Sequence, residues 1–374
     1  MSLLLDSLAS KEGYEKTDTF NQHLRKAAFE KGVPLIGCFE LTPRCTLDCK
    51  MCYVHLNEKQ MYQQELSTEN WISLIDEACD AGMMYAVLTG GECLLYHGFQ
   101  DIYDHLRARG ILITILTNGT LLDEDMVAWI AERSPQRIQI SVYGSSPEGY
   151  ERVTGNANAF YKVDKAIDLV KKHGIPFSLA ITVSKQILDD FEPTLRYCKA
   201  KEPYRCDVTM FPFEARKETG RDYEDFAPSI DEQVAIYKIR LRLEEKSAIP
   251  FSCEEKLFEE SEIHTDHIPA RTDGIQCTAG RIKFSISWDG KMTACNTFGF
   301  AEAFPFEDGF NIAWKYINDR ACNYHLPAEC FECKYKNACI PCPAVHWMAS
   351  GEGKINPIVC DEAKRMAMEG IRGL

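Results

Sequence analysis

The chain has 374 residues, of which 45% are hydrophobic and 11% aromatic, and its formal net charge is −14. This length exceeds one average domain, and the apolar content is enough to bury a core. The acidic balance argues against a nucleic-acid partner, because phosphate binding needs positive potential. No apolar run approaches the roughly 20 residues that span a bilayer, and residues 1–10 lack the basic start of a secretory signal. We therefore expect a cytoplasmic protein with no membrane or nucleic-acid partner.

The elements expected in chain order begin after a mixed, charged N-terminal extension over residues 1–34. From residue 35 to 215, short β-rich runs alternate with stretches of helical apolar spacing. The expected strands are 35–41, 85–91, 111–119, 137–144, 177–184 and 207–213, and the expected helices are 69–82, 98–110, 123–134, 163–174 and 191–201. Repeated strand–helix units with right-handed crossovers predict an α/β fold with a parallel sheet. Six such units predict a partial (β/α)6 barrel, with its chemistry at the carboxyl ends of the strands.

The composition of the chain changes twice after residue 215. Residues 216–275 are charged and helical in part, which predicts a bridging helical segment. Residues 276–374 are rich in loops, aromatic residues and cysteines, which predicts a separate C-terminal cysteine-rich domain. Within it, residues 288–291 (Trp-Asp-Gly-Lys) are typical of a hairpin turn that would bring Cys295 back beside Cys277.

The chain contains 17 cysteines, which in a reducing cytoplasm indicate metal binding or catalysis rather than disulfides. Cys45, Cys49 and Cys52 lie on one loop just after the first expected strand. A structural zinc site uses four ligands, and His55 is the residue close enough to complete one here. Three thiolates on one loop suit a 4Fe–4S cluster with one open iron, which is the interpretation we favour.

The spacing Cys45-x3-Cys49-x2-Cys52 resembles the signature of the radical S-adenosylmethionine (radical SAM) superfamily, and the resemblance extends over residues 35–215. It implies that the open iron chelates S-adenosylmethionine. It implies that one-electron reduction then yields a 5′-deoxyadenosyl radical, which abstracts a hydrogen from the substrate. The electron would come from a flavodoxin- or ferredoxin-type donor.

The sequence Gly90-Gly91-Glu92 follows the second expected strand and is similar to the family's GGE motif. Two glycines let the backbone approach a ligand closely, although glycines alone would also fit a turn at a strand end. Glu92 could accept from an ammonium group of the cofactor. Cys93 stands where relatives commonly have proline, and it is either a small core residue or a catalytic thiol.

Three further polar residues are candidate cofactor contacts. Ser141 ends the fourth expected strand, where relatives place a polar residue against the cofactor. Arg152 could pair a carboxylate bidentately. Asn118 is either a cofactor contact or a turn residue.

A second group of seven cysteines comprises Cys277, Cys295, Cys330, Cys333, Cys339, Cys342 and Cys360. Two Cys-x2-Cys pairs could instead hold one zinc ion. The order of all seven resembles the SPASM domain, which follows the radical SAM core in many peptide- and protein-modifying enzymes. The sequence departs from that pattern at one gap, between Cys339 and Cys342, which is one residue shorter than usual.

The SPASM resemblance implies two auxiliary 4Fe–4S clusters, the first bound by Cys277, Cys295 and Cys342 and the second by Cys330, Cys333, Cys339 and Cys360. The first set has only three thiolates, because residues 281–283 occupy the stretch where some relatives have a further cysteine. Its fourth iron would be open to a substrate thiolate, or would be bound by Cys322, by Cys253, or by solvent or another side chain.

The resemblance favours a peptide or protein substrate and a ribosomal-peptide maturase that forms a thioether or carbon–carbon crosslink or epimerises a residue. Sulfatase-maturating relatives have an aspartate as proton acceptor after the second SPASM cysteine. Asn296 stands there, and an amide is not a useful base. A sulfatase-type reaction would need Asp289 or Glu92 instead, and thioether formation fits Asn296 better because an iron-bound thiolate is already deprotonated.

The residues before the first expected strand are too few for a leader-peptide-binding domain, which implies a separate leader-peptide-binding protein or a site on the bridging segment and the SPASM surface. The alternatives are an anaerobic sulfatase-maturating enzyme, a small-molecule radical SAM dehydrogenase and a ferredoxin-like electron carrier. The carrier is disfavoured because it needs neither a GGE turn nor a barrel.

Overall fold

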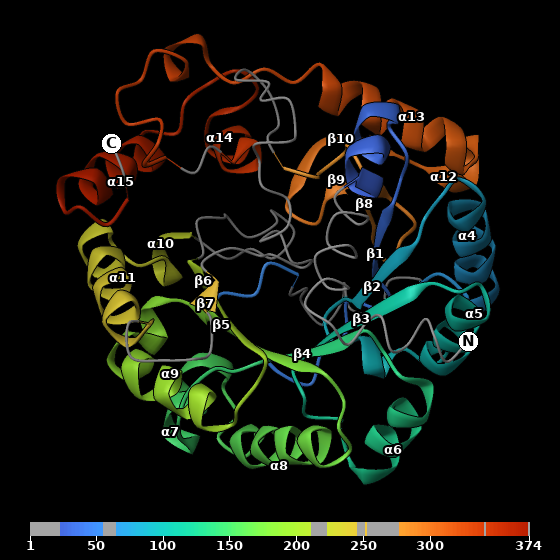
Figure 1. Ribbon diagram of the computed structural model, residues 1–374, viewed down its shortest axis with the longest axis horizontal. Coiled ribbons are helices and arrows are strands. Elements are labelled where there is room, and N and C mark those ends of the chain that lie inside the picture. Colours follow the sequence, from blue (N-terminus) through green and yellow to red (C-terminus); the bar gives the residue numbers. More distant parts are fainter. Residues whose placement is uncertain are drawn as a thin grey trace.

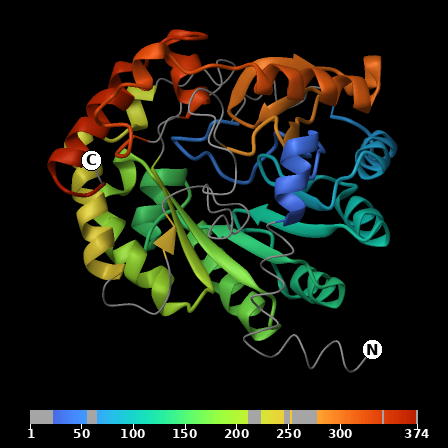
Figure 2. The same cartoon turned by 45° about the horizontal axis from the view of Figure 1, so that its top comes forward.

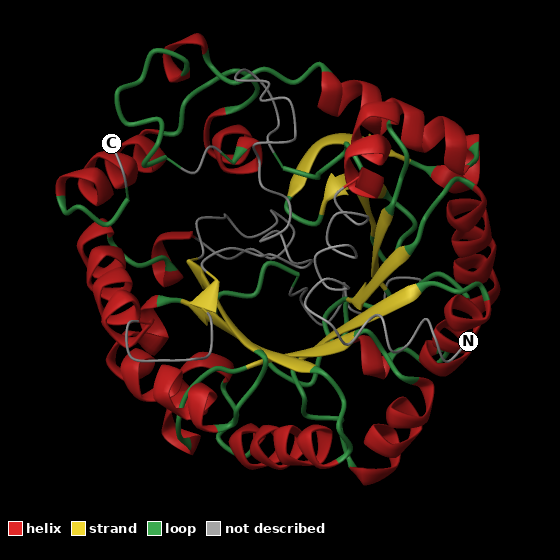
Figure 3. Ribbon diagram, in the orientation of Figure 1, coloured by secondary structure: helices red, strands yellow, loops and turns green. Residues whose placement is uncertain are grey.

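In the described residues, one curved sheet of ten strands has helices around its outer side (Figures 1 and 3). The computed structural model describes residues 23–54, 65–210, 223–244, 251–252, 277–339 and 342–372. The strand order is β10-β9-β8-β1-β2-β3-β4-β5-β6-β7, and β10 and β7 are the two edges. The sheet is therefore open, as a partial barrel requires.

The six expected strands are all present and pair in sequence order as a parallel array. They are β1 (Ile36–Glu40), β2 (Tyr85–Thr89), β3 (Leu112–Thr117), β4 (Arg137–Ser141), β5 (Phe177–Val183) and β6 (Arg205–Met210). The end of the last expected strand, residues 211–213, lies outside the described residues. The predicted partial barrel is confirmed.

The five expected helices are also present, as α4 (Thr68–Asp80), α5 (Phe99–Ala108), α6 (Glu124–Arg133), α8 (Ala159–Lys172) and α9 (Phe191–Ala200). Three short elements were not predicted, namely η1 (Cys93–Leu95), α7 (Pro147–Thr154) and η2 (Lys185–Asp190). The start of α7 carried a readable signal, because Ser146 caps Gly149 N–H and Pro147 occupies the first turn.

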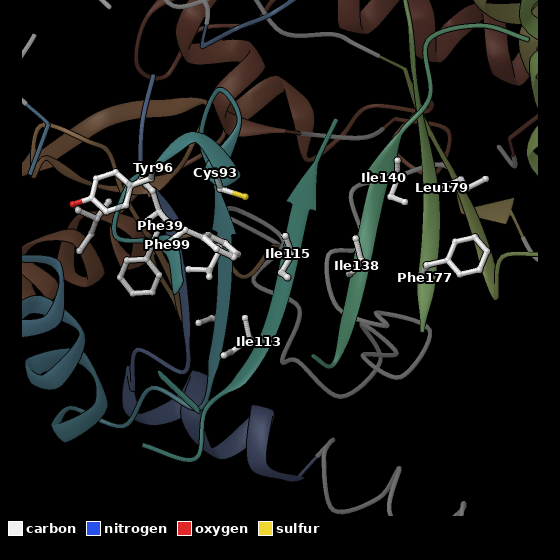
Figure 4. Close-up of a cluster of buried hydrophobic side chains, with 14 of the residues drawn as sticks. Phe39, Cys93, Tyr96, Phe99, Ile113, Ile115, Ile138, Ile140, Phe177 and Leu179 are labelled. Atoms are coloured by element: carbon white, nitrogen blue, oxygen red, sulfur yellow. The ribbon is translucent and has the colours of Figure 1, made fainter. Parts of the chain in front are cut away.

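The core between sheet and helices follows from alternation along the strands. Successive side chains point to opposite faces of a strand, so Ile138 and Ile140 of β4 face the helices together with Ile113 and Ile115 of β3. Figure 4 shows these side chains in one row with Leu179 of β5. The other face of the strands looks into the concave side of the sheet, where the polar residues at the carboxyl ends collect.

The C-terminal strands extend the same sheet. Strand β8 (Lys283–Ile286) pairs in parallel with β1, with Ser285 opposite Cys38. Strand β9 (Met292–Cys295) returns antiparallel to β8 and is followed by β10 (Phe298–Ala303). The expected hairpin is present, and Gly290 provides its positive φ of 85°. Cys295 therefore lies two strands from β1, which precedes the first cysteine loop.

The remaining helices complete the outer ring, and the orange and red C-terminal elements arc over one rim in Figure 2. They are α10 (Tyr223–Phe226), α11 (Ile230–Glu244), α12 (Pro305–Asp308), α13 (Phe310–Cys322), η6 (Ala328–Cys330), α14 (Pro343–Ser350) and α15 (Pro357–Met368). Strand β7 (Phe251–Ser252), which was not predicted, extends the sheet beyond β6. Helix α11 meets α15, where Lys238 pairs with Glu369 at 2.7 Å. In the described part of the chain, no helix has the length and apolar character that crossing a bilayer requires.

An aromatic cluster joins the barrel to the C-terminal region. Phe284 of β8 is fully buried, and its ring lies 5.9 Å from that of Phe39 on β1. It also lies 5.1 Å from Phe310 and 6.1 Å from Trp314, both on α13. Edge-to-face contacts of this kind add to the burial of apolar area.

We therefore expect Phe284→Ala to destabilise the fold by about 3–5 kcal/mol, because it leaves a cavity between β1 and α13. Urea denaturation of the metal-free protein measures this change. Phe306→Ala is the matched control, because Phe306 is 46% exposed and its removal leaves no internal cavity. Equal effects of the two substitutions would contradict the assigned role of Phe284.

Candidate active site

The loop that carries Cys45, Cys49 and Cys52 leaves β1 at the carboxyl edge of the sheet. Cys49 is buried and the other two thiols are half-buried. The Cys52 N–H donates to Cys49 O at 3.1 Å, which forms a turn between these two ligand candidates. The Asp48 and Lys50 N–H groups donate to carbonyls at the end of α7, which fixes the loop against the barrel.

The three sulfurs lie near one another and near one phenol. Burial raises the pKa of Tyr143, and negative charge on Cys49, Cys45 and Cys52 would raise it further. Tyr143 also hydrogen-bonds to Ser141, the polar residue expected at the end of β4. The structure thus brings Ser141 to the cysteine loop, with Tyr143 between them.

The Gly90–Glu92 turn packs directly on the cysteine loop. The Gly91 N–H donates to Thr42 O at 2.7 Å, and the Glu92 N–H donates to Arg44 O at 2.8 Å. A Cβ atom on Gly90 would lie 2.4 Å from Thr42 O, and one on Gly91 would lie 2.4 Å from Arg44 O. Real Cβ atoms do not approach backbone oxygens so closely, so both positions require glycine.

Glu92 is 1% exposed and accepts hydrogen bonds from the end of β3. Thr117 Oγ1 lies 2.8 and 2.9 Å from its two oxygens, and the Asn118 N–H donates to Oε2 at 2.8 Å. Burial raises the pKa of this carboxyl, while the hydrogen bonds oppose that rise. The visible role of Glu92 is to hold the Asn118 turn. An ammonium group would have to share these oxygens.

Asn118 lies against the first cysteine. Its Nδ2 donates to Cys45 Sγ at 3.3 Å and to Thr46 Oγ1 at 3.0 Å, while its Oδ1 accepts from the Thr120 N–H at 2.9 Å. Burial raises the pKa of Cys45 to about 12, and the Asn118 donor lowers it in part. Iron binding would have to displace the thiol proton.

Two sequence candidates have other surroundings. Cys93 is fully buried and its Sγ lies 3.3 Å from Leu116 O, within the core shown in Figure 4. A thiol in that position is enclosed by packed side chains. Arg152 lies on the exposed face of α7, with Glu148 as its charged neighbour. His55, the candidate fourth zinc ligand, lies outside the described residues.

The seven C-terminal cysteines fall into two groups. Burial raises the pKa of Cys342 to about 12, and charge on Cys277 and Cys295 would add to that rise. Burial likewise raises the pKa of Cys339 to about 12, with further contributions from Cys360 and Cys330. Cys333 interacts with the second group through Cys360, Cys330 and Cys339. These are the two sets that the SPASM resemblance implies, and iron binding by them stays a prediction.

Of the two cysteines proposed as fourth ligand of the first set, one lies in the described residues. Cys322 ends α13, and its Sγ lies 3.8 Å from Asn318 Oδ1. Cys253 lies outside the described residues. Within the described ranges, no three His, Cys, Asp or Glu side chains converge on one point for a single metal ion. A four-iron cluster takes one thiolate at each of several separate irons, so its ligands need not converge in that way.

Two contacts that sequence reasoning missed tie the cysteine loop to the C-terminal region. Asn296, next to Cys295, donates from Nδ2 to Glu40 Oε1 at 2.8 Å. Trp288 packs on Val54 and Cys52. The isolated carboxylate in the apolar run of residues 35–41 was the available signal for the first contact, because buried charges need partners.

Arg44, beside Cys45, makes a bidentate ion pair with Glu65, with Nε–Oε1 at 2.8 Å and Nη2–Oε2 at 3.0 Å. Thr42 hydrogen-bonds to the same carboxylate. This pair was also missed by the sequence analysis, because the partners are 21 positions apart and nothing in their spacing links them. This ion pair joins the residue before Cys45 to a residue that follows the cysteine loop in the chain.

Comparison with known proteins matches this site to one family. The profile of the radical SAM superfamily matches residues 39–198. An AdoMet-dependent heme synthase from Methanosarcina barkeri is 24% identical over 85% of this chain and 94% of the relative. A PqqA peptide cyclase from Granulibacter bethesdensis is 31% identical over 45% of each chain.

Solved structures show the same fold. Streptococcus suis SuiB bound to S-adenosylmethionine gives a TM-score of 0.67 at 16% identity, covering 94% of this chain and 83% of SuiB. Native anSMEcpe with bound AdoMet gives a TM-score of 0.67 at 17% identity, covering 90% of this chain and 98% of its own. The profile match therefore assigns residues 39–198 to the radical SAM superfamily.

The contact between the glycine turn and the cysteine loop generates a test. We expect Gly91→Ala to lower the iron bound after anaerobic reconstitution, because the added methyl would push the backbone at Arg44 away from its present position. Iron assay and the visible absorbance measure this loss. Gly299→Ala is the control, because a Cβ at that position meets ordinary contacts of 3.5 Å or more. Full iron loading of Gly91→Ala would show that the close approach is not needed.

Proposed function

We propose that the chain is a radical SAM enzyme with a SPASM-type C-terminal region that abstracts hydrogen from a peptide or protein substrate. The observation that carries the proposal is the set of three thiols at the carboxyl edge of a parallel sheet, in backbone contact with a Gly-Gly-Glu turn. In open α/β sheets that edge is where ligands bind.

The residues fit the groups that this function needs. Cys45, Cys49 and Cys52 would bind a 4Fe–4S cluster with one open iron, which suits S-adenosylmethionine. Two auxiliary clusters would be bound by the C-terminal sets, one by Cys277, Cys295 and Cys342 and the other by Cys330, Cys333, Cys339 and Cys360. When bound, the loop cluster and S-adenosylmethionine supply a 5′-deoxyadenosyl radical that removes a hydrogen atom from the substrate.

The chain's own residues position these groups. Asn118 donates to the sulfur of Cys45, and hydrogen bonds to a ligating sulfur tune a cluster's reduction potential. Gly90 and Gly91 bring peptide groups close to the loop without side chains between them. Ser141, on the concave side with Tyr143, is available to the cofactor.

A peptide substrate is supported by the relatives. PqqA peptide cyclases match this chain, and SuiB has been crystallised with its precursor peptide SuiA. The anSMEcpe protein has likewise been crystallised with peptides. We place the reaction in the cytoplasm, with a flavodoxin- or ferredoxin-type electron donor and a separate leader-peptide-binding protein as partners. An open iron beside Cys277, Cys295 and Cys342 would allow thioether formation with a substrate thiolate.

A small-molecule substrate is the second candidate. It is favoured by the heme synthase relative, which aligns with 85% of this chain, whereas the PqqA peptide cyclase aligns with 45%. Sulfatase-type oxidation is less consistent with the site, because Asn296 is an amide and its Nδ2 is bonded to Glu40. Anaerobic turnover with dithionite and S-adenosylmethionine, offered cysteine-containing peptides or an iron porphyrin precursor, separates the two candidates by mass spectrometry. A modified peptide supports the proposal, and conversion of the porphyrin alone overturns it.

The two cysteine regions predict the metal content. We expect the anaerobically reconstituted protein to bind roughly twelve irons and twelve sulfides, as three 4Fe–4S clusters. Iron, sulfide and zinc assays on the purified chain measure this. About four irons per chain together with stoichiometric zinc would contradict the two auxiliary clusters.

The first loop predicts where S-adenosylmethionine is cleaved. Simultaneous replacement of Cys45, Cys49 and Cys52 by alanine should abolish 5′-deoxyadenosine formation and leave the auxiliary absorbance. The reason is that, among the described residues, this is the loop that joins three thiols to the Gly90–Glu92 turn. Liquid chromatography of the reaction measures 5′-deoxyadenosine, and Cys198→Ala, which removes a buried core thiol, is the control. Continued cleavage by the triple variant would refute the assignment.

A further inference from the structure

We propose that the buried carboxylate of Glu40 is a positioning residue for the cluster assigned to Cys277, Cys295 and Cys342. Acting through Asn296, it orients the segment next to Cys295 and holds the cluster's reduction potential down. The inference rests on the auxiliary-cluster assignment of the proposed function.

The location of Glu40 sets it apart from the other acidic residues. It is the last residue of β1, and its neighbours Phe39 and Leu41 pack in the core on the helical side. Strand alternation therefore turns Glu40 to the concave side, the side of Cys38. The residue is 1% exposed. A carboxylate removed from water is costly unless polar groups surround it, so its place here needs a compensating interaction.

Asn296 provides that interaction with a defined orientation. Its Nδ2 donates to Glu40 Oε1 at 2.8 Å, and its Oδ1 accepts from Ser285 Oγ at 2.7 Å. Because the hydroxyl and the carboxylate occupy opposite ends of the amide, the amide group must face Glu40 with its nitrogen. Ser285 lies on β8 opposite Cys38 of β1, so the whole network is built on adjacent strands.

The network ends beside a proposed iron ligand. Asn296 directly follows Cys295, and the thiol of Cys342 interacts with Cys295 and with Cys277. Adding an electron to a cluster is harder beside a negative charge, and a buried charge is poorly screened by solvent. Hydrogen bonds and charge around a cluster are established determinants of its potential. Glu40 therefore favours the oxidised form of this cluster, the form able to accept one electron.

The cluster assigned to the second C-terminal group of cysteines serves as a reference within the same protein. Its thiols have acidic neighbours of their own, namely Glu329 at Cys330, Glu362 at Cys339 and Asp361 at Cys360. Glu40 instead bonds to Asn296, the residue next to Cys295 of the first group. Its effect should accordingly be confined to the cluster whose signal disappears in Cys295→Ala.

The experiment is a redox titration of the full-length, reconstituted holoenzyme followed by electron paramagnetic resonance. In Glu40→Gln, which keeps the shape and removes the charge, the reduced-to-oxidised ratio of this cluster at a fixed potential should rise about tenfold. That ratio corresponds to a shift of about 59 mV to higher potential for a one-electron couple. Glu302→Gln is the matched control, because it removes a carboxylate on neighbouring β10 that is 44% exposed and paired with Lys291. The reduction potential of the cluster in Glu302→Gln should equal that in the unmodified protein.

A charge swap completes the test. The double variant Glu40→Gln with Asn296→Asp exchanges the carboxylate and the amide of this hydrogen-bonded pair. It should restore the original potential of the cluster. An unchanged potential in Glu40→Gln, or a shifted one in the double variant, overturns the inference. Where Glu40→Gln loses iron instead, recovery of iron in the double variant supports the inference and continued loss overturns it. About four irons in the unmodified protein would overturn the proposed function instead.

Discussion

The structure depends on a close approach between two backbone segments. The exit of β2 crosses the exit of β1 so closely that the Gly91 and Glu92 N–H groups donate to the Thr42 and Arg44 carbonyls. Only residues without a Cβ atom allow this at positions 90 and 91. The contact places a buried carboxylate and the turn that it holds next to the first of three thiols. The geometry of the active site is therefore set mainly by backbone, and side chains refine it.

The second organising feature is the continuity of the sheet. Because β8 pairs in parallel with β1, the strand that leads into the first cysteine loop is the neighbour of the hairpin that ends at Cys295. The aromatic cluster around Phe284 fastens this junction. Both cysteine regions are thus attached to one rigid sheet. An electron that leaves a substrate on the concave side would pass between groups held at fixed positions. Rigid support matters because small displacements of reacting groups cost large factors in rate.

Much of the barrel could be predicted because its signals are local. Alternating apolar residues identify the strands, as in residues 137–141, and amphipathic spacing identifies helices such as α4 and α8. Helix α7 was missed because it has only eight residues, even though Ser146 and Pro147 mark its start. The addition of β8 to the barrel sheet was not predictable, since pairing with β1 joins residues about 250 positions apart.

The candidate site shows the same division between local features, which the sequence predicts, and long-range contacts, which it does not. Cysteine spacing predicted the first loop, while the SPASM resemblance implied the two C-terminal sets, whose iron binding stays a prediction. Spacing could not identify the partners of those cysteines. Asn118 was considered as a turn residue or cofactor contact, and the structure places its amide against Cys45 and Thr46. Glu40 was not considered at all, because its partner Asn296 is 256 positions away.

The placement of Asn296 bears on the reaction itself. An amide cannot take up a proton at neutral pH, and this amide is already committed at both ends, to Glu40 and to Ser285. A reaction that must deprotonate its substrate beside Cys295 would need a base from elsewhere. A substrate thiol that binds an iron loses its proton on binding, and a crosslink made from it needs no further base at that point. The side chain next to Cys295 is therefore not a candidate base, and the hydrogen bonds that show this join residues far apart in the sequence.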